Sequence, residues 1–205
     1  MMSGMSPSSR VFSPVSVSAG TPPSHCNLTG IPRKVKDSCA DIYNGVQKWN
    51  KLSTDGILLM NKIASARLRS FQGTENRDLE QNAAKLTYSD DVSELCSLLL
   101  DVWKRMEEQV NKMFAVRKNL EAIVQLDQQV PFETWPLCRF TETCQKVVTT
   151  YVKELQVKKC LLEDVAHGKD AQVLSFLVTA WTYNPYIEDD CKLSVEAMVN
   201  EVGFR

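Results

Sequence analysis

The stretch VKDSCADIYNGVQKWNKLSTDGILLMNKIASA, residues 35–66, decides the fold class of this chain. Its apolar positions recur at steps of three and four residues, which places them on one face of a helix. They are Val35, Cys39, Ile42, Val46, Trp49, Leu52, Gly56, Leu59, Ile63 and Ala66. Two successive steps of three meet at Trp49, where a heptad seam is locally overwound. The pattern predicts a helix over residues 35–70, about 50 Å long at 1.5 Å per residue.

A second seam of this kind follows residues 71–87, which are polar, lack periodicity and predict a loop. Ser89 and Asp90 can cap the helix that follows. Its apolar positions are Val92, Leu95, Leu99, Val102, Met106, Val110, Met113, Val116, Leu120 and Ile123. Two steps of four meet at Met106. Residues 33–126 are therefore expected to form a long antiparallel helical hairpin. Because each seam has a defect, bent multi-helix packing is favoured over an uninterrupted two-stranded coiled coil.

The C-terminal region, residues 127–205, predicts a set of about three further helices. The first begins near Pro136 and stops at Gly168, because proline is tolerated in a first turn and glycine ends helices. The second starts after Asp170 and ends at Asn184–Pro185. The last starts at Asp189 or Asp190 and places these side chains inward: Leu193, Ala197, Met198 and Val202. The whole pattern predicts an all-α helical bundle in which two long coiled-coil-like helices precede this set.

Residues 1–32 form a tail rich in serine and proline, with too few apolar side chains to offset the entropy of ordering. We expect this tail to be disordered. Ser6, Ser13 and Thr21 each precede a proline, the minimal pattern for proline-directed kinases. Phosphorylation at these residues and an inert linker are both compatible with the pattern.

The composition excludes several classes of protein. A formal net charge of −1 over 205 residues argues against bulk binding to nucleic acid or acidic membranes. The first residues lack the apolar run of a signal peptide, and the apolar runs are too short to cross a bilayer. The seven irregularly spaced cysteines are then expected to be reduced thiols in the cytosol or nucleus.

No catalytic apparatus is expected from the residues that usually supply one. His25 lies in the tail, and His167 precedes Gly168, where a helix dipole favours a histidine. Cysteines and histidines do not occur at metal-ligand spacings, and no glycine-rich phosphate loop is present. We therefore expect no enzyme activity, no cofactor and no metal.

Aromatic and proline side chains gather at two junctions between the expected helices. They are Phe132, Trp135 and Pro136 at the first, and Trp181, Tyr183, Pro185 and Tyr186 at the second. Such rings fill the corners of helical bundles, and they are also enriched among residues that dominate binding. Both interpretations stay open. Taken with the two seams, the candidate partner-binding residues are Trp49, Leu99, Met106, Met113, Phe132, Trp135, Trp181 and Tyr186.

Short motifs at these junctions resemble those of the cyclin-dependent kinase 2-interacting protein family. They are Phe132–Pro136 (FETWP), Tyr151–Leu155 (YVKEL), Ala166–His167, Trp181–Glu188 (WTYNPYIE) and Glu196–Gly203 (EAMVNEVG), with Arg33–Asp37 (RKVKD) and Trp49 near the front. The resemblance covers residues 33–205, and the middle helix matches by pattern more than by identity. The tail and residues 71–87 match poorly.

The resemblance implies a non-enzymatic coiled-coil adaptor of the nucleus, with the cytoplasm as a second location. The implied partners are proteins: cyclin and cyclin-dependent kinase, replication-initiation kinase and origin factors, a checkpoint kinase partner, and subunits of an AAA+ ATPase complex. DNA replication, DNA damage and repair, cell division, replisome turnover and ribosome maturation are the implied processes.

Two functions remain in competition on the sequence. In the first, the seams at residues 35–66 and 92–123 dock helices of a partner protein. In the second, a self-associating structural coiled coil buries the same seams against its own copy.

Overall fold

The computed structural model describes residues 29–72, 82–126, 132, 134–168 and 170–204. These residues form five helices: α1 (Ile31–Gln72), α2 (Asn82–Leu126), α3 (Leu137–Val165), α4 (Ala171–Tyr183) and α5 (Asp189–Glu201). The all-α helical fold is thereby confirmed. A bilayer-spanning helix, which would be long and strongly apolar, does not occur in this described part of the chain.

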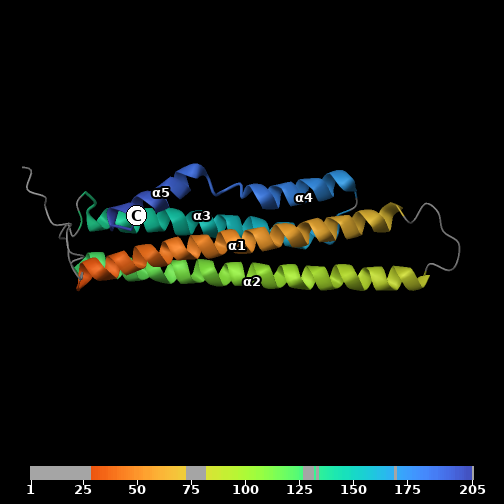
Figure 1. The fold of residues 1–205 in the computed structure, drawn as a ribbon, viewed down its shortest axis with the longest axis horizontal. Helices are drawn as coiled ribbons and strands as arrows, with labels where there is room; N and C mark the ends of the chain where they lie inside the picture. The colour runs from red at the N-terminus through yellow and green to blue at the C-terminus, as the bar shows by residue number, and fades with distance from the viewer. Residues whose placement is uncertain (1–28, 73–81, 127–131, 133, 169, 205) are drawn as a thin grey trace, which may run out of the picture.

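The helices run up and down in a four-part bundle (Figure 1). α2 returns antiparallel to α1, α3 returns beside α2, and α4 and α5 run back one after the other. α4 and α5 share one position in the bundle, and both contact α1 and α3. The last position is therefore filled by a helix that is broken in the middle.

The two predicted seams form the core of this bundle. In the first seam every member except the half-buried Leu59 is buried. Trp49, where the steps of three meet, packs edge-on against Tyr151 of α3 with ring centroids 5.2 Å apart. The chain's own helices therefore cover the seams, contrary to the expectation that a partner's helices do so. The physical reason is that α3 and the α4–α5 pair are together long enough to cover most of the hairpin.

The loop between the long helices is shorter than expected. α1 continues to Gln72 and α2 begins at Asn82, so that Ser89 and Asp90 lie inside α2 and do not cap it. Residues 82–87 include two alanines, a lysine and a leucine, which are strong helix formers and extend the helix toward its N-terminus. The rest of the expected loop lies outside the described residues.

The N-terminal boundary also differs. α1 begins at Ile31, so the last two residues of the expected tail belong to the helix. Pro32 fits there because the first turn of a helix does not need its N–H. The disorder expected for the remainder of the tail falls on residues 1–28, outside the described part.

The ends of α4 follow the sequence signals, whereas α3 ends at Val165, three residues before the stop expected at Gly168. The Asp170 carboxylate accepts a hydrogen bond of 2.8 Å from the Val173 N–H and so caps α4. Asn184 ends α4 in the left-handed conformation with φ 47°, directly before Pro185.

The inward face predicted for the last helix was partly wrong. Met198 and Val202 are buried as expected, whereas Leu193 and Ala197 are exposed. Cys191 and Val195 are buried in their place. Steps of four, three and four from Cys191 to Val202 give a straighter stripe, and this stripe faces the core.

Candidate functional site

The eight candidate partner-binding residues divide sharply by exposure. Six are buried within the chain's own bundle: Trp49, Leu99, Met106, Met113, Trp135 and Trp181. Phe132 is half-buried, and Tyr186 is 48% exposed. Partner binding through the six buried residues stays a prediction that requires the bundle to open. The three candidate phosphorylation residues, Ser6, Ser13 and Thr21, lie outside the described part of the chain.

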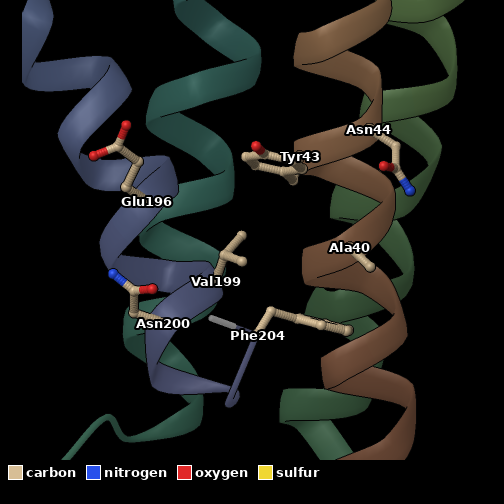
Figure 2. Close-up of a pocket in the computed structure, with 7 residues that line it drawn as sticks. All are labelled: Ala40, Tyr43, Asn44, Glu196, Val199, Asn200 and Phe204. Atoms are coloured by element: carbon tan, nitrogen blue, oxygen red, sulfur yellow. The ribbon is translucent and has the colours of Figure 1, made fainter.

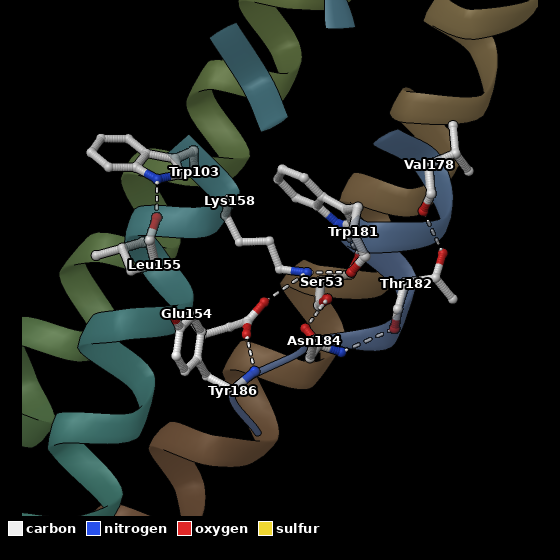
Figure 3. A network of polar contacts seen from close by, with 10 residues as sticks. All are labelled: Ser53, Trp103, Glu154, Leu155, Lys158, Val178, Trp181, Thr182, Asn184 and Tyr186. Atoms are coloured by element: carbon white, nitrogen blue, oxygen red, sulfur yellow. Dashed lines mark hydrogen bonds and ion pairs between the residues drawn. The ribbon is translucent and has the colours of Figure 1, made fainter. Parts of the chain in front are cut away.

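A buried ion pair lies where α3 meets the break between α4 and α5. The side chains of Glu154 and Lys158 are fully buried, and Glu154 Oε1 lies 3.5 Å from Lys158 Nζ. The other carboxylate oxygen accepts a 2.9 Å hydrogen bond from the Tyr186 N–H, just past the break. Lys158 Nζ also donates to the Trp181 carbonyl oxygen. The pair thus holds both sides of the break (Figure 3).

The same junction is tied to α1 by two further hydrogen bonds. The Trp181 indole N–H donates to the Ser53 carbonyl oxygen at 3.1 Å, and the Ser53 hydroxyl donates to the Asn184 side-chain oxygen at 3.3 Å. We call these six residues the central polar cluster: Ser53, Glu154, Lys158, Trp181, Asn184 and Tyr186. It joins three elements, α1, α3 and the α4–α5 break, as Figure 3 shows.

Burial and charge act against each other on Lys158. Removal from water disfavours the ammonium form and lowers the pKa of Lys158 to about 8, while Glu154 opposes that shift. The ammonium also lies 4.7 Å from the centroid of the Trp181 ring, a cation–π contact. Lys158 therefore depends on its partners in the cluster, because an unpartnered buried charge is strongly unfavourable.

Gly56 is explained by the same cluster. A Cβ atom at this position would lie 2.7 Å from Cε2 of the buried Trp181 ring. Glycine is therefore needed on the seam because the indole packs directly against the backbone of α1.

A second set of contacts joins the start of α3 to the end of α5. The Glu201 carboxylate accepts hydrogen bonds from the Thr134 N–H at 2.7 Å, the Thr134 hydroxyl at 2.7 Å and the Trp135 N–H at 2.9 Å. Partial desolvation alone would raise the pKa of Glu201, but these hydrogen bonds outweigh it and hold the pKa below its usual value. We call Thr134, Trp135 and Glu201 the terminal cluster.

The aromatic residues of this corner pack beneath the terminal cluster. Phe140 lies at the centre, with ring centroids 5.2 Å from Phe132 and 5.1 Å from Trp135. The Arg139 guanidinium covers the Trp135 ring at 4.5 Å. Filling of the bundle corner is thus the role that the structure shows for these rings.

Sequence reasoning missed the polar members of both clusters. A signal for Lys158 was present, because residues 151, 155, 158, 162 and 165 follow steps of four, three, four and three, and residue 158 is the polar one. A charged residue in an apolar stripe indicates a buried partner. Glu201 and Ser53 gave no comparable signal, since their contacts join residues 66 to 131 positions apart in the chain.

One hollow on the surface lies between α1 and α5 and has a volume of about 500 Å³. Figure 2 shows Tyr43 of α1 and Val199 of α5 directed into this space, with Phe204 closing one end. The lining residues are Ala40, Tyr43, Asn44, Glu196, Val199, Asn200 and Phe204. An apolar floor with a few polar groups can accept a side chain of a bound protein.

The cysteines divide by exposure: Cys39 and Cys144 are buried, whereas Cys138 and Cys160 are exposed. Burial raises the pKa of Cys39, and it raises the pKa of Cys144 to about 12, so both side chains are neutral thiols at physiological pH. Where the structure describes the chain, it brings together no set of three His, Cys, Asp or Glu side chains able to hold a metal ion.

Comparison with known proteins identifies the family. No protein-family model matches the chain. The sequence is, however, 31% identical to the cyclin-dependent kinase 2-interacting protein of Xenopus laevis over 190 residues, 87% of this chain and 92% of that protein. This chain belongs to the cyclin-dependent kinase 2-interacting protein family. The proteins of the same name from Homo sapiens and Mus musculus are each 28% identical over 191 residues, 84% of this chain and 90% of theirs.

The motifs that carry the family resemblance meet in the two clusters. FETWP supplies Thr134 and Trp135, whose N–H groups donate to Glu201 of the EAMVNEVG motif. YVKEL supplies Glu154, which binds Tyr186 of WTYNPYIE. The resemblance of this family member therefore lies mainly in the contacts that fix α4 and α5 to the rest of the bundle.

Proposed function

We propose that this chain is a non-enzymatic adaptor that binds a cyclin-dependent kinase. The observation that carries the proposal is its membership of a family whose relatives are named for interaction with cyclin-dependent kinase 2. The neutral buried thiols and the mutually paired Glu154 and Lys158 support the absence of catalysis, because these groups serve the fold.

The test is a direct binding measurement with purified components. The full chain is titrated against purified cyclin-dependent kinase 2, alone and with its cyclin, in a calorimeter. We expect a Kd on the order of 1 μM or tighter, which corresponds to about −8 kcal/mol. A matched control is the chain with Lys158→Ala, whose bundle is expected to be destabilised. An absence of heat at every concentration of the folded wild-type chain would contradict the proposal.

The finer part of the proposal places the adaptor in the nucleus, in DNA replication and checkpoint signalling. It also assigns the chain to an AAA+ ATPase complex that acts in replisome turnover and ribosome maturation. The motif resemblance supports these roles. Crosslinking and mass spectrometry of the endogenous complex should return replication-kinase, checkpoint and AAA+ subunits at constant stoichiometry, and fluorescence imaging of the tagged chain should show a nuclear signal. A purely cytoplasmic signal would contradict the nuclear location, and a complex without these subunits would contradict the assigned partners.

A further inference from the structure

α4 differs from the usual surface helix in having no charged side chain. Its thirteen residues, AQVLSFLVTAWTY, include no Asp, Glu, Lys, Arg or His. One face is buried in the bundle through Leu174, Leu177 and Trp181. A helix with one buried face normally carries charged or polar side chains on the other.

An apolar stripe runs along the exposed side of this helix. Phe176 is 68% exposed, Tyr183 is 78% exposed and Val173 is 43% exposed. With the half-buried Ala180 they follow steps of three, four and three, so they lie on one face. We call these four residues the α4 stripe. Large aromatic side chains that are this exposed and share one face are unusual on a surface unless another molecule covers them.

The α4 stripe ends in negative charge on both sides. Residues 163–170, which precede α4, carry three carboxylates and one lysine. Residues 188–192, which follow the break, also carry three carboxylates. Asp189 pairs with Lys192 and Asp190 pairs with Lys146 of α3, so the net negative charge of this end is that of Glu188. A second copy of this chain is therefore a poor occupant, because parallel and antiparallel pairing both bring an acidic end against an acidic end.

We propose that the α4 stripe inserts into an apolar groove of a partner protein whose rim carries lysine or arginine. The anchors Val173, Phe176 and Tyr183 have the spacing of helices that dock into grooves. Aromatic anchors of this kind dominate binding energy. The basic rim follows from the acidic ends of the stripe. The inference rests on the proposed function, because the partner meant is the kinase assembly named there.

The central polar cluster prepares the helix for this role. It fixes Trp181 and Asn184 on either side of Tyr183, and Asp170 caps the other end of α4. The stripe is therefore held in its binding conformation before a partner arrives, which removes much of the entropy loss on association.

The test compares two double variants of the full chain that gain the same charge. Phe176→Asp with Tyr183→Asp alters the stripe, while Leu58→Asp with Leu98→Asp alters side chains of α1 and α2 that are 59% and 47% exposed. Each is titrated against purified cyclin-dependent kinase 2 with its cyclin. We expect the stripe variant to bind at least about 30-fold more weakly and the control within about threefold of wild type. Thermal unfolding midpoints should show that both variants remain folded, since all four side chains are exposed.

Three outcomes would overturn the proposal. If wild type binds and the stripe variant binds equally well, the stripe is not the docking surface, although the proposed function stands. If the wild-type chain does not bind the kinase, the proposed function and this inference fall together. If sedimentation shows a wild-type dimer that the stripe variant loses, the occupant is a second copy. The basic rim has its own test, because Glu188→Gln should slow association, and unchanged rates would exclude that rim.

Discussion

The α1–α2 hairpin and the C-terminal half of the molecule (α3–α5) are held together by different kinds of contact. The long helices meet along repeated apolar side chains, and each of these side chains contributes only apolar packing. α4 and α5 depend in addition on single polar contacts, such as Tyr186 to Glu154 and Trp135 to Glu201. Apolar packing tolerates exchange of similar side chains, whereas a polar cluster needs each member. This difference explains why most of the family motifs lie in the C-terminal half.

The largest effect is expected from Lys158→Ala. The substitution leaves Glu154 buried without its cation, which should lower the free energy of unfolding by about 3–5 kcal/mol. Urea denaturation followed by circular dichroism measures the change. The control replaces both charges, Glu154→Leu with Lys158→Met, and should lose less than the single variant. A double variant that is less stable than Lys158→Ala would show that the ion pair itself is not the critical feature.

Met106→Ala probes the hairpin in the same assay. Met106 is fully buried, and removal of its side chain should lower the free energy of unfolding by about 2–4 kcal/mol. Met106→Leu conserves volume and should change stability by less than about 1.5 kcal/mol. If the two variants are equally unstable, the hairpin requires specific side chains after all, and the contrast between the regions disappears.

Two glycines of α1 sharpen the comparison. A Cβ at Gly56 meets the rigid, hydrogen-bonded Trp181 ring, whereas a Cβ at Gly45 meets Cγ of Met113 at 2.8 Å. Methionine can change rotamer, but the indole cannot move without losing its bond to Ser53. Alanine gains about 1 kcal/mol of helix propensity at either position, and this gain offsets part of the steric cost. We expect Gly56→Ala to destabilise the protein by about 1–2 kcal/mol, and Gly45→Ala to destabilise it by less because Met113 can move aside. Equal thermal midpoints for the two variants would contradict this account.

The smallest effect is expected from Glu201→Gln, and it should depend on pH. The pKa of Glu201 is lower in the folded state, so its contribution to stability is present above the unfolded pKa of about 4.3 and is lost as pH falls. The variant should be about 1 kcal/mol less stable at pH 7. The difference from wild type should shrink below about pH 4. A constant difference across this range would mean that the charge of Glu201 is not involved.

The candidate site was less predictable than the fold. Aromatic residues such as Trp135 and Trp181 were recognisable as important, but not as core residues, because composition and spacing allow a ring to fill a corner or to face a partner. The α4 stripe was also missed. Only the packing of Trp181 against Gly56 fixes which side of α4 remains exposed.

The sequence by itself determined the all-α class, the two long helices, the end of α3 before Gly168 and the break at Asn184–Pro185. These features follow from the spacing of apolar residues and from backbone preferences, which are local properties. The tertiary structure alone decided that the seams are covered from within and that Glu154, Lys158 and Glu201 join distant helices. Those contacts depend on which helix faces meet in space. The apolar seam of a helix indicates that it must be buried, but not which helices bury it.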